Sequence, residues 1–167
     1  MTHSPHPDLA PISVQCAILT VSDTRTVDTD RSGQLMRQSL EDAGHAVVDY
    51  KLLPDEPTQI RQQILSWCQA STPIQAVLIN GGTGIAPRDT TYDAIEHLLE
   101  KVLPGFGELF RWLSYQEIGS RAMASRAIAG VCRGRLIFSL PGSSNAVQLA
   151  MEKLILPELA HLMRQIG

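Results

Sequence analysis

Hydrophobic and polar positions divide the chain into blocks with the spacing of strands and helices. The segment VQCAILTVS, residues 14–22, is apolar on both faces and rich in β-branched side chains, which is typical of a buried parallel strand. HAVVDYKLL (residues 45–53) and AVLIN (residues 76–80) predict two further strands. Polar or glycine-rich residues follow all three and predict loops at residues 22–32, 54–56 and 81–89.

Helical spacing separates these strands. Residues 33–44 carry apolar side chains near one helical face and end at Gly44, a good stop signal. In residues 57–70, Ile60, Ile64 and Trp67 share one face, and Pro57 suits the first turn. The order strand, helix, strand, helix, strand predicts an open parallel sheet with helices on both faces. Ligands bind such sheets at the carboxyl ends of the strands.

The second half of the chain predicts helices near residues 92–101, 105–118 and 121–126. AIAGVCRGRLIFSLPG, residues 127–142, then predicts two strands joined by a tight turn, in which Gly134 supplies a positive φ. Two closing helices follow, separated near Pro157. We therefore expect a three-layer α/β/α fold with a mostly parallel central sheet and a short C-terminal β-hairpin. Residues 1–12 are a polar, proline-rich tail, and residues 13–167 form one domain.

Composition limits the possible partners. The chain has 167 residues, a formal net charge of −3 and a pI of about 5.9. Without a basic excess we expect no nucleic-acid partner, and an anionic ligand has to be bound by a local site. No apolar stretch approaches the roughly 18 residues that a membrane span needs, and the first residues do not follow the order of a signal peptide. We expect a cytoplasmic protein with no membrane partner.

Cysteine and histidine patterns predict no metal centre of their own. Cys16, Cys68 and Cys132 form no Cys-x-x-Cys pair, and an odd number of cysteines is typical of reduced, buried thiols. The histidines are scattered without the spacing of metal ligands. No Ser-His-Asp or Cys-His arrangement is recognisable, which disfavours covalent hydrolase chemistry.

The segment GGTGIAPRD, residues 81–89, is the most informative candidate site. Backbone N–H groups of a glycine turn before a helix bind anions, although a tight connection without a ligand has the same composition. The segment matches neither a Walker A loop nor the dinucleotide fingerprint. Arg88 is suited to a phosphate. Asp89 would repel a phosphate unless Mg²⁺ lies between them; alternatively, it caps the next helix.

Other candidates follow strands at the same edge. Asp55 follows the second strand, and Ser22 and Asp23 end the first, although all three residues are also ordinary in turns. LPGSSNA, residues 140–146, is a second turn before a helix and a second possible anion site. Two such turns predict a ligand with two phosphorylated parts. Arg126 can reach such a ligand or be a plain surface residue, and the apolar face around Phe110 is core or subunit contact.

In this order and at these separations, GGTGIAPRDTT, LPGFGELFR, SRAIAG and LPGSSNA resemble the MoaB/MogA family of molybdenum cofactor biosynthesis proteins. ILTVSDTRTVDTDRSG and LLPDE resemble the same family, so the likeness runs from about residue 13 to the end. FRWLSYQEIGSRAMASRAIAG is closer to the MoaB branch than to MogA. The resemblance implies the molybdopterin-binding-like fold and a homotrimer, or a homohexamer of two trimers.

The resemblance also implies an activity. Active members adenylylate molybdopterin with Mg-ATP and release pyrophosphate, and their product serves a downstream molybdate-insertion enzyme. Asp55 and Asp89 match the aspartates associated with activity and would hold or orient Mg²⁺. The nucleotide and phosphate side comprises Gly81, Gly82, Thr83, Gly84 and Arg88. The molybdopterin side comprises Ser22, Asp23, Ser125, Arg126, Pro141, Gly142, Ser143 and Ser144.

Two other functions remain open at this point. Some MoaB-branch proteins lack the two aspartates and do not catalyse, so a non-catalytic protein that binds molybdopterin or its precursor is one alternative. A nucleotide pyrophosphatase-like role is the other, since competence-damage-type proteins contain a related domain. This chain keeps Asp55 and Asp89, which favours the enzyme. It departs from the family at Tyr92, where members commonly have proline, and this affects the start of the next helix.

Overall fold

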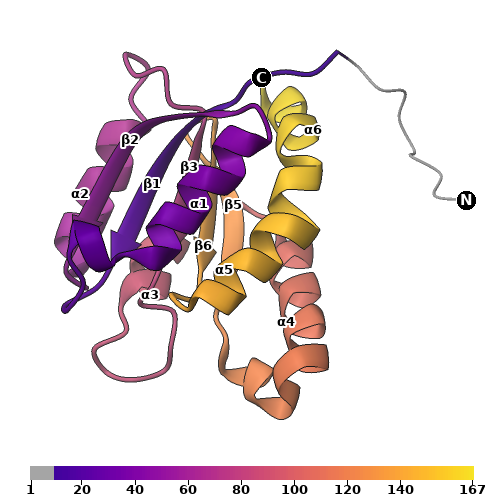
Figure 1. Ribbon diagram of the computed structural model, residues 1–167. Helices are drawn as coiled ribbons and strands as arrows, with labels where there is room; N and C mark the ends of the chain where they lie inside the picture. Colours follow the sequence, from indigo (N-terminus) through magenta and orange to yellow (C-terminus); the bar gives the residue numbers. More distant parts are fainter. Residues whose placement is uncertain (1–9) are drawn as a thin grey trace, which may run out of the picture.

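The computed structural model describes residues 10–167, which form a six-stranded sheet with helices on both faces (Figure 1). The strand order is β2-β1-β3-β6-β5-β4. Neighbouring strands are parallel among β2 (Ala46–Leu53), β1 (Gln15–Val21), β3 (Ala76–Asn80) and β6 (Arg135–Leu140). Antiparallel pairing adds β5 (Ile128–Cys132) and then β4 (Lys101–Val102). The predicted α/β fold with a mostly parallel sheet is confirmed.

The hairpin of β5 and β6 is part of the central sheet. Its two turn residues, Arg133 and Gly134, have φ values of 48° and 71°. Positive φ at both central positions is the conformation of a type I′ hairpin turn. The predicted positive φ at Gly134 is therefore confirmed. The predicted tail falls mostly on residues 1–9, outside the described residues.

Six α-helices are present in the described chain: α1 (Arg31–Asp42), α2 (Pro57–Trp67), α3 (Thr91–Glu96), α4 (Pro104–Ile118), α5 (Ser144–Ala150) and α6 (Leu156–Ile166). Two 3₁₀ turns span Val27–Thr29 and Gly119–Ala124. The two predicted closing helices are present and the second begins next to Pro157, but a π-helical turn, Met151–Ile155, joins α5 to α6 without a gap. Pro157 lies in the first turn of α6, where its missing N–H costs little.

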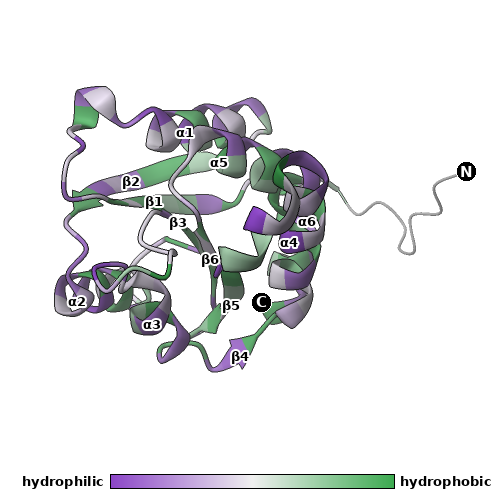
Figure 2. Cartoon of the chain, turned by 90° about the horizontal axis from the view of Figure 1, so that it is seen from below, coloured by the Kyte–Doolittle hydropathy of each residue, from purple (hydrophilic) through white to green (hydrophobic). Residues whose placement is uncertain are grey.

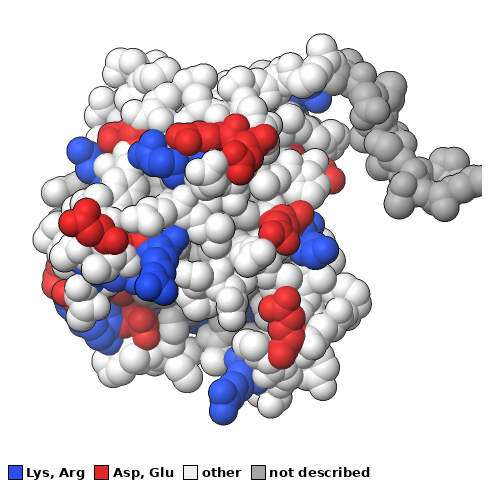
Figure 3. Space-filling model, in the orientation of Figure 1, with Lys and Arg blue, Asp and Glu red and all other residues white. Residues whose placement is uncertain are grey.

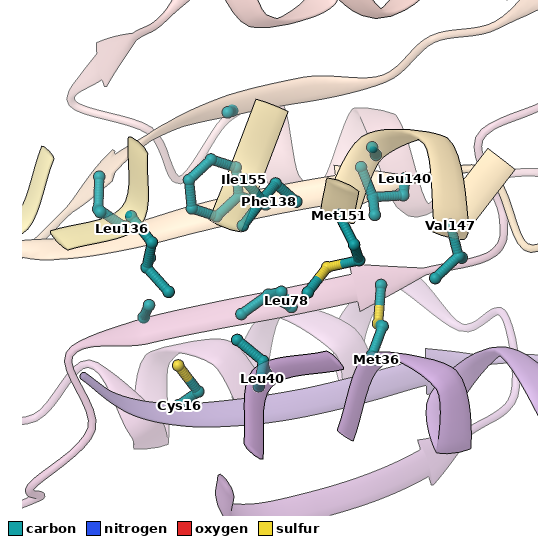
Figure 4. Packing of buried hydrophobic residues seen from close by; sticks show 14 of the residues in the cluster. Cys16, Met36, Leu40, Leu78, Leu136, Phe138, Leu140, Val147, Met151 and Ile155 are labelled. Carbon is teal, nitrogen blue, oxygen red and sulfur yellow. The ribbon is translucent and has the colours of Figure 1, made fainter. Parts of the chain in front are cut away.

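Alternate residues of the strands supply two hydrophobic clusters, one on each face of the sheet. Cys16, Ile18 and Leu78 face the cluster covered by α1, α4, α5 and α6, whereas Ala17 and Leu19 face the cluster covered by α2 and α3. Figure 4 shows Met36 and Leu40 of α1 beside Val147, Met151 and Ile155 over the first face. Figure 2, seen from below, shows helices on both sides of the strands.

The parallel strands place four loops at one edge of the sheet. The chain leaves β1, β2, β3 and β6 at this edge, which is the lower end of the molecule in Figure 1. Because β5 is antiparallel to β6, its first residue and the preceding Ser125 and Arg126 lie at the same edge. Every predicted site segment therefore arrives there. Within residues 10–167, no helix has both the length and the apolar character that crossing a membrane requires.

Candidate functional site

A pocket of about 350 Å³ lies where the two predicted anion-binding turns meet the end of α4. The turn after β3 and the turn after β6 both contribute to its wall. The lining residues are Gly81, Gly82, Thr83, Gly84, Asp89, Phe110, Ser114, Ile118, Ala124, Ser125, Pro141, Gly142, Ser143 and Ala146. One ligand in this pocket can therefore touch both turns.

The turn after β3 needs glycine for two reasons. Gly81 and Gly82 have φ values of 102° and 65°, which L side chains rarely adopt. A Cβ atom on Gly81 would lie 2.1 Å from the Val21 carbonyl oxygen, and one on Gly82 would lie 2.0 Å from Thr91 Oγ1. Within residues 10–167, the N–H groups of Gly82, Thr83 and Gly84 donate to no protein acceptor. Three consecutive donors are thus available to an anionic ligand.

Asp55 lies behind this turn and does not line the pocket. It is only 5% exposed. Its Oδ1 accepts hydrogen bonds from Thr90 Oγ1 at 2.7 Å, Thr91 Oγ1 at 3.2 Å and the Thr90 N–H at 3.3 Å. A Cβ on Gly82 would lie 2.4 Å from Asp55 Oδ2. These contacts favour a role in holding the turn, and direct metal contact by Asp55 stays a prediction.

Asp89 lies in the pocket wall beside the glycine turn. It is partly exposed, and its Oδ2 accepts a hydrogen bond from the Ala86 N–H at 3.1 Å. A Cβ on Gly84 would lie 2.6 Å from the same oxygen, so the glycine gives the carboxylate its space. The predicted alternative of a helix cap is not observed, because Thr90 is the N-cap residue of α3 and no side chain caps this helix. The Asp89 carboxylate therefore lies in the pocket wall with one hydrogen bond from its own loop, and its role as a metal ligand stays a prediction.

Arg88 points to other acidic side chains and does not line the pocket. Its Nε and Nη2 donate to the two carboxylate oxygens of Asp23 at 2.9 and 3.0 Å, and its Nη1 donates to Glu56 at 2.8 Å. The Arg88 hydrogen bonds and the backbone N–H of Asp55 lower the pKa of Asp23 below its ordinary value. Arg88 thus ties the loops after β1, β2 and β3 together in this structure.

Arg126 fixes the loop that carries Asp89. Its guanidinium donates to the carbonyl oxygens of Gly84 at 3.0 Å and Asp89 at 3.1 Å, and it pairs with Asp93 at 3.2 Å. It also lies 4.8 Å from the centre of the Tyr92 ring. The residue at the unusual Tyr92 position therefore supports this arginine, and Arg126 shapes the pocket from outside its wall.

The remaining predicted residues differ in where they lie. Ser125 lines the pocket, and its Oγ is buried without a hydrogen-bond partner in the described structure. Ser143 is the N-cap residue of α5, with its Oγ accepting from the Ala146 N–H at 3.2 Å. Ser22 Oγ accepts from two N–H groups of its own loop. Ser144 contacts Ser32 at 3.4 Å and does not line the pocket.

Sequence reasoning missed the contribution of α4 to the pocket. Phe110, Ser114 and Ile118 share one helical face and line it, together with Ala124 from the following 3₁₀ turn. The apolar face was predicted as core or subunit contact, and Phe110 is indeed buried in the core. A small hydroxyl, Ser114, within that apolar face was the available signal.

The described residues, 10–167, contain no ready-made metal centre. No three His, Cys, Asp or Glu side chains of this part of the chain are grouped closely enough to hold a metal ion. The three cysteines are free and buried, as predicted. Figure 3 shows acidic and basic side chains interspersed on the face it presents. On that face the figure shows no extended basic patch.

Known proteins are similar to this chain in sequence and in fold. Residues 17–161 match a family model described as "Probable molybdopterin binding domain". The chain is 55% identical over 167 residues to Molybdenum cofactor biosynthesis protein B of Halalkalibacterium halodurans (99% of this chain, 98% of that protein), and 53% identical to its Bacillus subtilis counterpart with the same coverage. A crystal structure of a Molybdenum cofactor biosynthesis protein B superposes with a TM-score of 0.91 at 51% identity, covering 95% of this chain and 98% of that one. The chain therefore belongs to the family of molybdopterin-binding domains that includes the molybdenum cofactor biosynthesis proteins B.

Proposed function

We propose that this protein is a molybdopterin adenylyltransferase that uses Mg-ATP and releases pyrophosphate. Its family places it in molybdenum cofactor biosynthesis. The observation that carries the finer assignment is one pocket lined by both turns and by Asp89. Such a pocket suits two phosphorylated substrates bound next to each other.

The reaction joins two anions. An oxygen of the molybdopterin phosphate attacks the α-phosphorus of ATP, the new P–O bond forms, and the bond to the β-phosphate breaks as pyrophosphate leaves. The attacking phosphate is already ionised, so the protein has little proton transfer to catalyse. Its task is to position both substrates and to balance their charge. The N–H groups of Gly82, Thr83 and Gly84 are free to bind nucleotide phosphate oxygens, and the turn at residues 141–143 faces the same space.

The residues present fit a Mg²⁺ ion at Asp89. Mg²⁺ is commonly held by one or two carboxylates together with substrate phosphates, and Asp89 presents a partly exposed carboxylate in the pocket wall. Neutralisation of phosphate charge is the chemistry that this ion would supply when bound. Asp55 supports the site by accepting hydrogen bonds from Thr90 and Thr91, the two residues directly after Asp89.

We further propose that the chain works as a homo-oligomer, a trimer or a hexamer of two trimers. The exposed Leu109 and Trp112 of α4, three residues apart on one helical face, support this assembly because monomers seldom leave large apolar patches uncovered. The adenylylated product would pass to a downstream molybdate-insertion enzyme.

A product assay tests the enzyme proposal. Purified protein with molybdopterin, ATP and Mg²⁺ should yield adenylylated molybdopterin and pyrophosphate, and removal of Mg²⁺ with a chelator should stop the reaction. Binding of molybdopterin without any product would overturn the enzyme and favour the non-catalytic binding protein instead.

Two glycine-to-alanine substitutions test whether the reaction takes place in this pocket. Gly84→Ala forces the Asp89 carboxylate to move, because the new Cβ lies 2.6 Å from its oxygen, whereas a Cβ on Gly105 meets nothing within 4 Å. Gly84→Ala should lower the rate on the order of tenfold or more, since small misplacements of reacting groups are costly. Gly105→Ala should leave the rate unchanged. Equal rates in the two variants would place the reaction elsewhere.

A further inference from the structure

The carbonyl oxygen of Gly142, in the second turn of the pocket, is held by two side chains from a distant part of the chain. Arg25 Nη2 donates to it at 2.8 Å, and Ser32 Oγ donates to it at 2.7 Å. Both distances are those of well-formed hydrogen bonds. Neither Arg25 nor Ser32 lines the pocket, whereas Gly142 and Ser143 do. The two donors therefore act on the pocket only through the backbone of the turn.

The anchored carbonyl fixes the direction of the next N–H group. The Gly142–Ser143 peptide is trans, so the Ser143 N–H points away from the carbonyl and hence away from Arg25 and Ser32. Within residues 10–167 this N–H donates to no protein acceptor. It is therefore a free donor, held on the side of the turn opposite to its two anchors.

One buried carboxylate places both anchors. Asp30 is 1% exposed and caps α1, because its Oδ1 accepts from the Gly33 N–H at 3.0 Å, and this cap fixes the helix that carries Ser32. The same oxygen lies 3.6 Å from Arg25 Nη1. Its Oδ2 accepts from Thr20 Oγ1 at 2.5 Å and from the Tyr50 hydroxyl at 2.6 Å. A carboxylate buried this deeply is tolerated because both of its oxygens accept hydrogen bonds and an arginine lies nearby.

We propose that Arg25, Ser32 and Asp30 are positioning residues that orient the Gly142–Ser143 peptide, so that the Ser143 N–H binds an anionic group of the ligand. This rests on the proposed function for the identity of that group, the phosphate of molybdopterin. The three residues belong to the loop after β1 and the start of α1, and none of them touches the ligand. Through the hydrogen bonds of Arg25 and Ser32, they connect β1 and α1 to the turn after β6.

Ser32→Ala and Arg25→Gln each remove one of the two anchors and spare the buried Asp30, whose loss endangers folding. Each variant should raise KM for molybdopterin roughly three- to tenfold, the effect of about one hydrogen bond, and leave KM for ATP unchanged. Ser32→Thr keeps the hydroxyl and should retain most of the affinity. Ser39→Ala, on the same helix, and Arg37→Gln, which removes an exposed positive charge from it, are the matched controls.

Amide chemical shifts separate this proposal from the enzyme assignment. Titration of ¹⁵N-labelled protein with inorganic phosphate and with molybdopterin should shift the Ser143 amide in wild type, with a smaller shift in Ser32→Ala. Product formation with an unmoved Ser143 amide would overturn the positioning role and leave the enzyme assignment standing. A Ser143 shift without any product would do the reverse. Equal Ser143 shifts in wild type and Ser32→Ala, in two proteins of equal thermal stability, would also refute the anchoring role.

Discussion

Asp55 and Asp89 meet the same glycine turn at different glycines, and this difference separates their roles. The Asp55 carboxylate lies next to Gly82 and accepts hydrogen bonds from Thr90 and Thr91. The Asp89 carboxylate lies next to Gly84, in the pocket wall. We therefore expect Asp55 to hold the loop and Asp89 to bind a ligand.

Metal affinity distinguishes the two residues. With Mn²⁺ in place of Mg²⁺ and a non-hydrolysable ATP analogue, Asp89→Asn should weaken metal binding tenfold or more, because it removes the charged oxygen in the pocket. Asp55→Asn should leave Mn²⁺ affinity within about twofold, yet lower the free energy of unfolding by roughly 1–3 kcal/mol, the cost of a buried amide N–H donor that meets no acceptor. Electron paramagnetic resonance of free Mn²⁺ measures the first quantity and urea unfolding the second. An equal loss of Mn²⁺ affinity in both variants would instead confirm Asp55 as a metal contact.

At the scale of residues, the sequence predicts where backbone turns lie. It does not predict which side chains line a pocket or which side chains pair across loops. Residues 81–84 and 141–143 were predictable because glycine, which permits positive φ, and proline, which fixes φ, mark a strand-to-helix turn. Asp89 was predictable because a negative charge beside an anion site requires an explanation. Ser114 was not, because one small residue on an apolar helix reads equally well as core. The two acceptors of Arg88 lie 65 and 32 residues away along the chain and were beyond any local pattern.

At the scale of elements, His45 links the starts of β1 and β2. Its ring Nδ1 accepts a hydrogen bond from the Val14 N–H at 3.2 Å, so the neutral ring is the form that fits. Burial lowers the pKa of His45 below its ordinary value. Protonation therefore costs more in the folded than in the unfolded chain.

The sign of the resulting pH dependence follows from linkage. Below the unfolded pKa of about 6.5, the unfolded chain binds a proton at His45 that the folded chain resists, so stability falls as the pH falls through that value. His45→Gln retains an acceptor and cannot titrate. Between pH 7.5 and 5.5, thermal unfolding should therefore show a smaller loss in His45→Gln than in wild type. His97→Gln, at the exposed end of α3, should behave like wild type; the same slope in all three proteins would contradict the role of His45.

Elements were predictable where burial dominates the local pattern. β1 and β3 are continuous apolar runs, and their bounds agree with the sequence prediction to within a residue. The predicted helix at residues 92–101 ends at Glu96 instead, because Lys101 and Val102 pair with β5. A two-residue strand has no periodicity of its own, so only the sheet defines it. The π-helical turn before α6 carries the buried Met151 and Ile155, and the local sequence pattern does not predict it.

The whole molecule leaves an apolar face uncovered on α4. Leu109 and Trp112 are 51% and 60% exposed, and a groove of about 420 Å³ lies between α4 and the helices that end the chain. The groove is lined by Leu103, Pro104, Gly105, Phe106, Leu109, Phe138, Lys153, Leu154, Glu158 and Leu162. The sequence predicts that the apolar residues of this helix belong to the core or to a subunit contact. It does not predict which residues serve which role. Phe106 and Phe110 pack inward, and Leu109 faces out.

Molar mass in solution tests whether a second copy covers this face. Light scattering coupled to size-exclusion chromatography should give wild type three times the chain mass of 18.3 kDa, or six times for a hexamer. Leu109→Glu puts a charge into the apolar groove and should reduce the mass toward that of one chain, because burying an unpaired carboxylate at a contact is strongly unfavourable. Gln62→Glu adds the same charge to an exposed position on α2, across the sheet, and should leave the mass unchanged. A wild-type oligomer that survives Leu109→Glu would place the subunit contact on another face, and a monomeric wild type would overturn the proposed assembly.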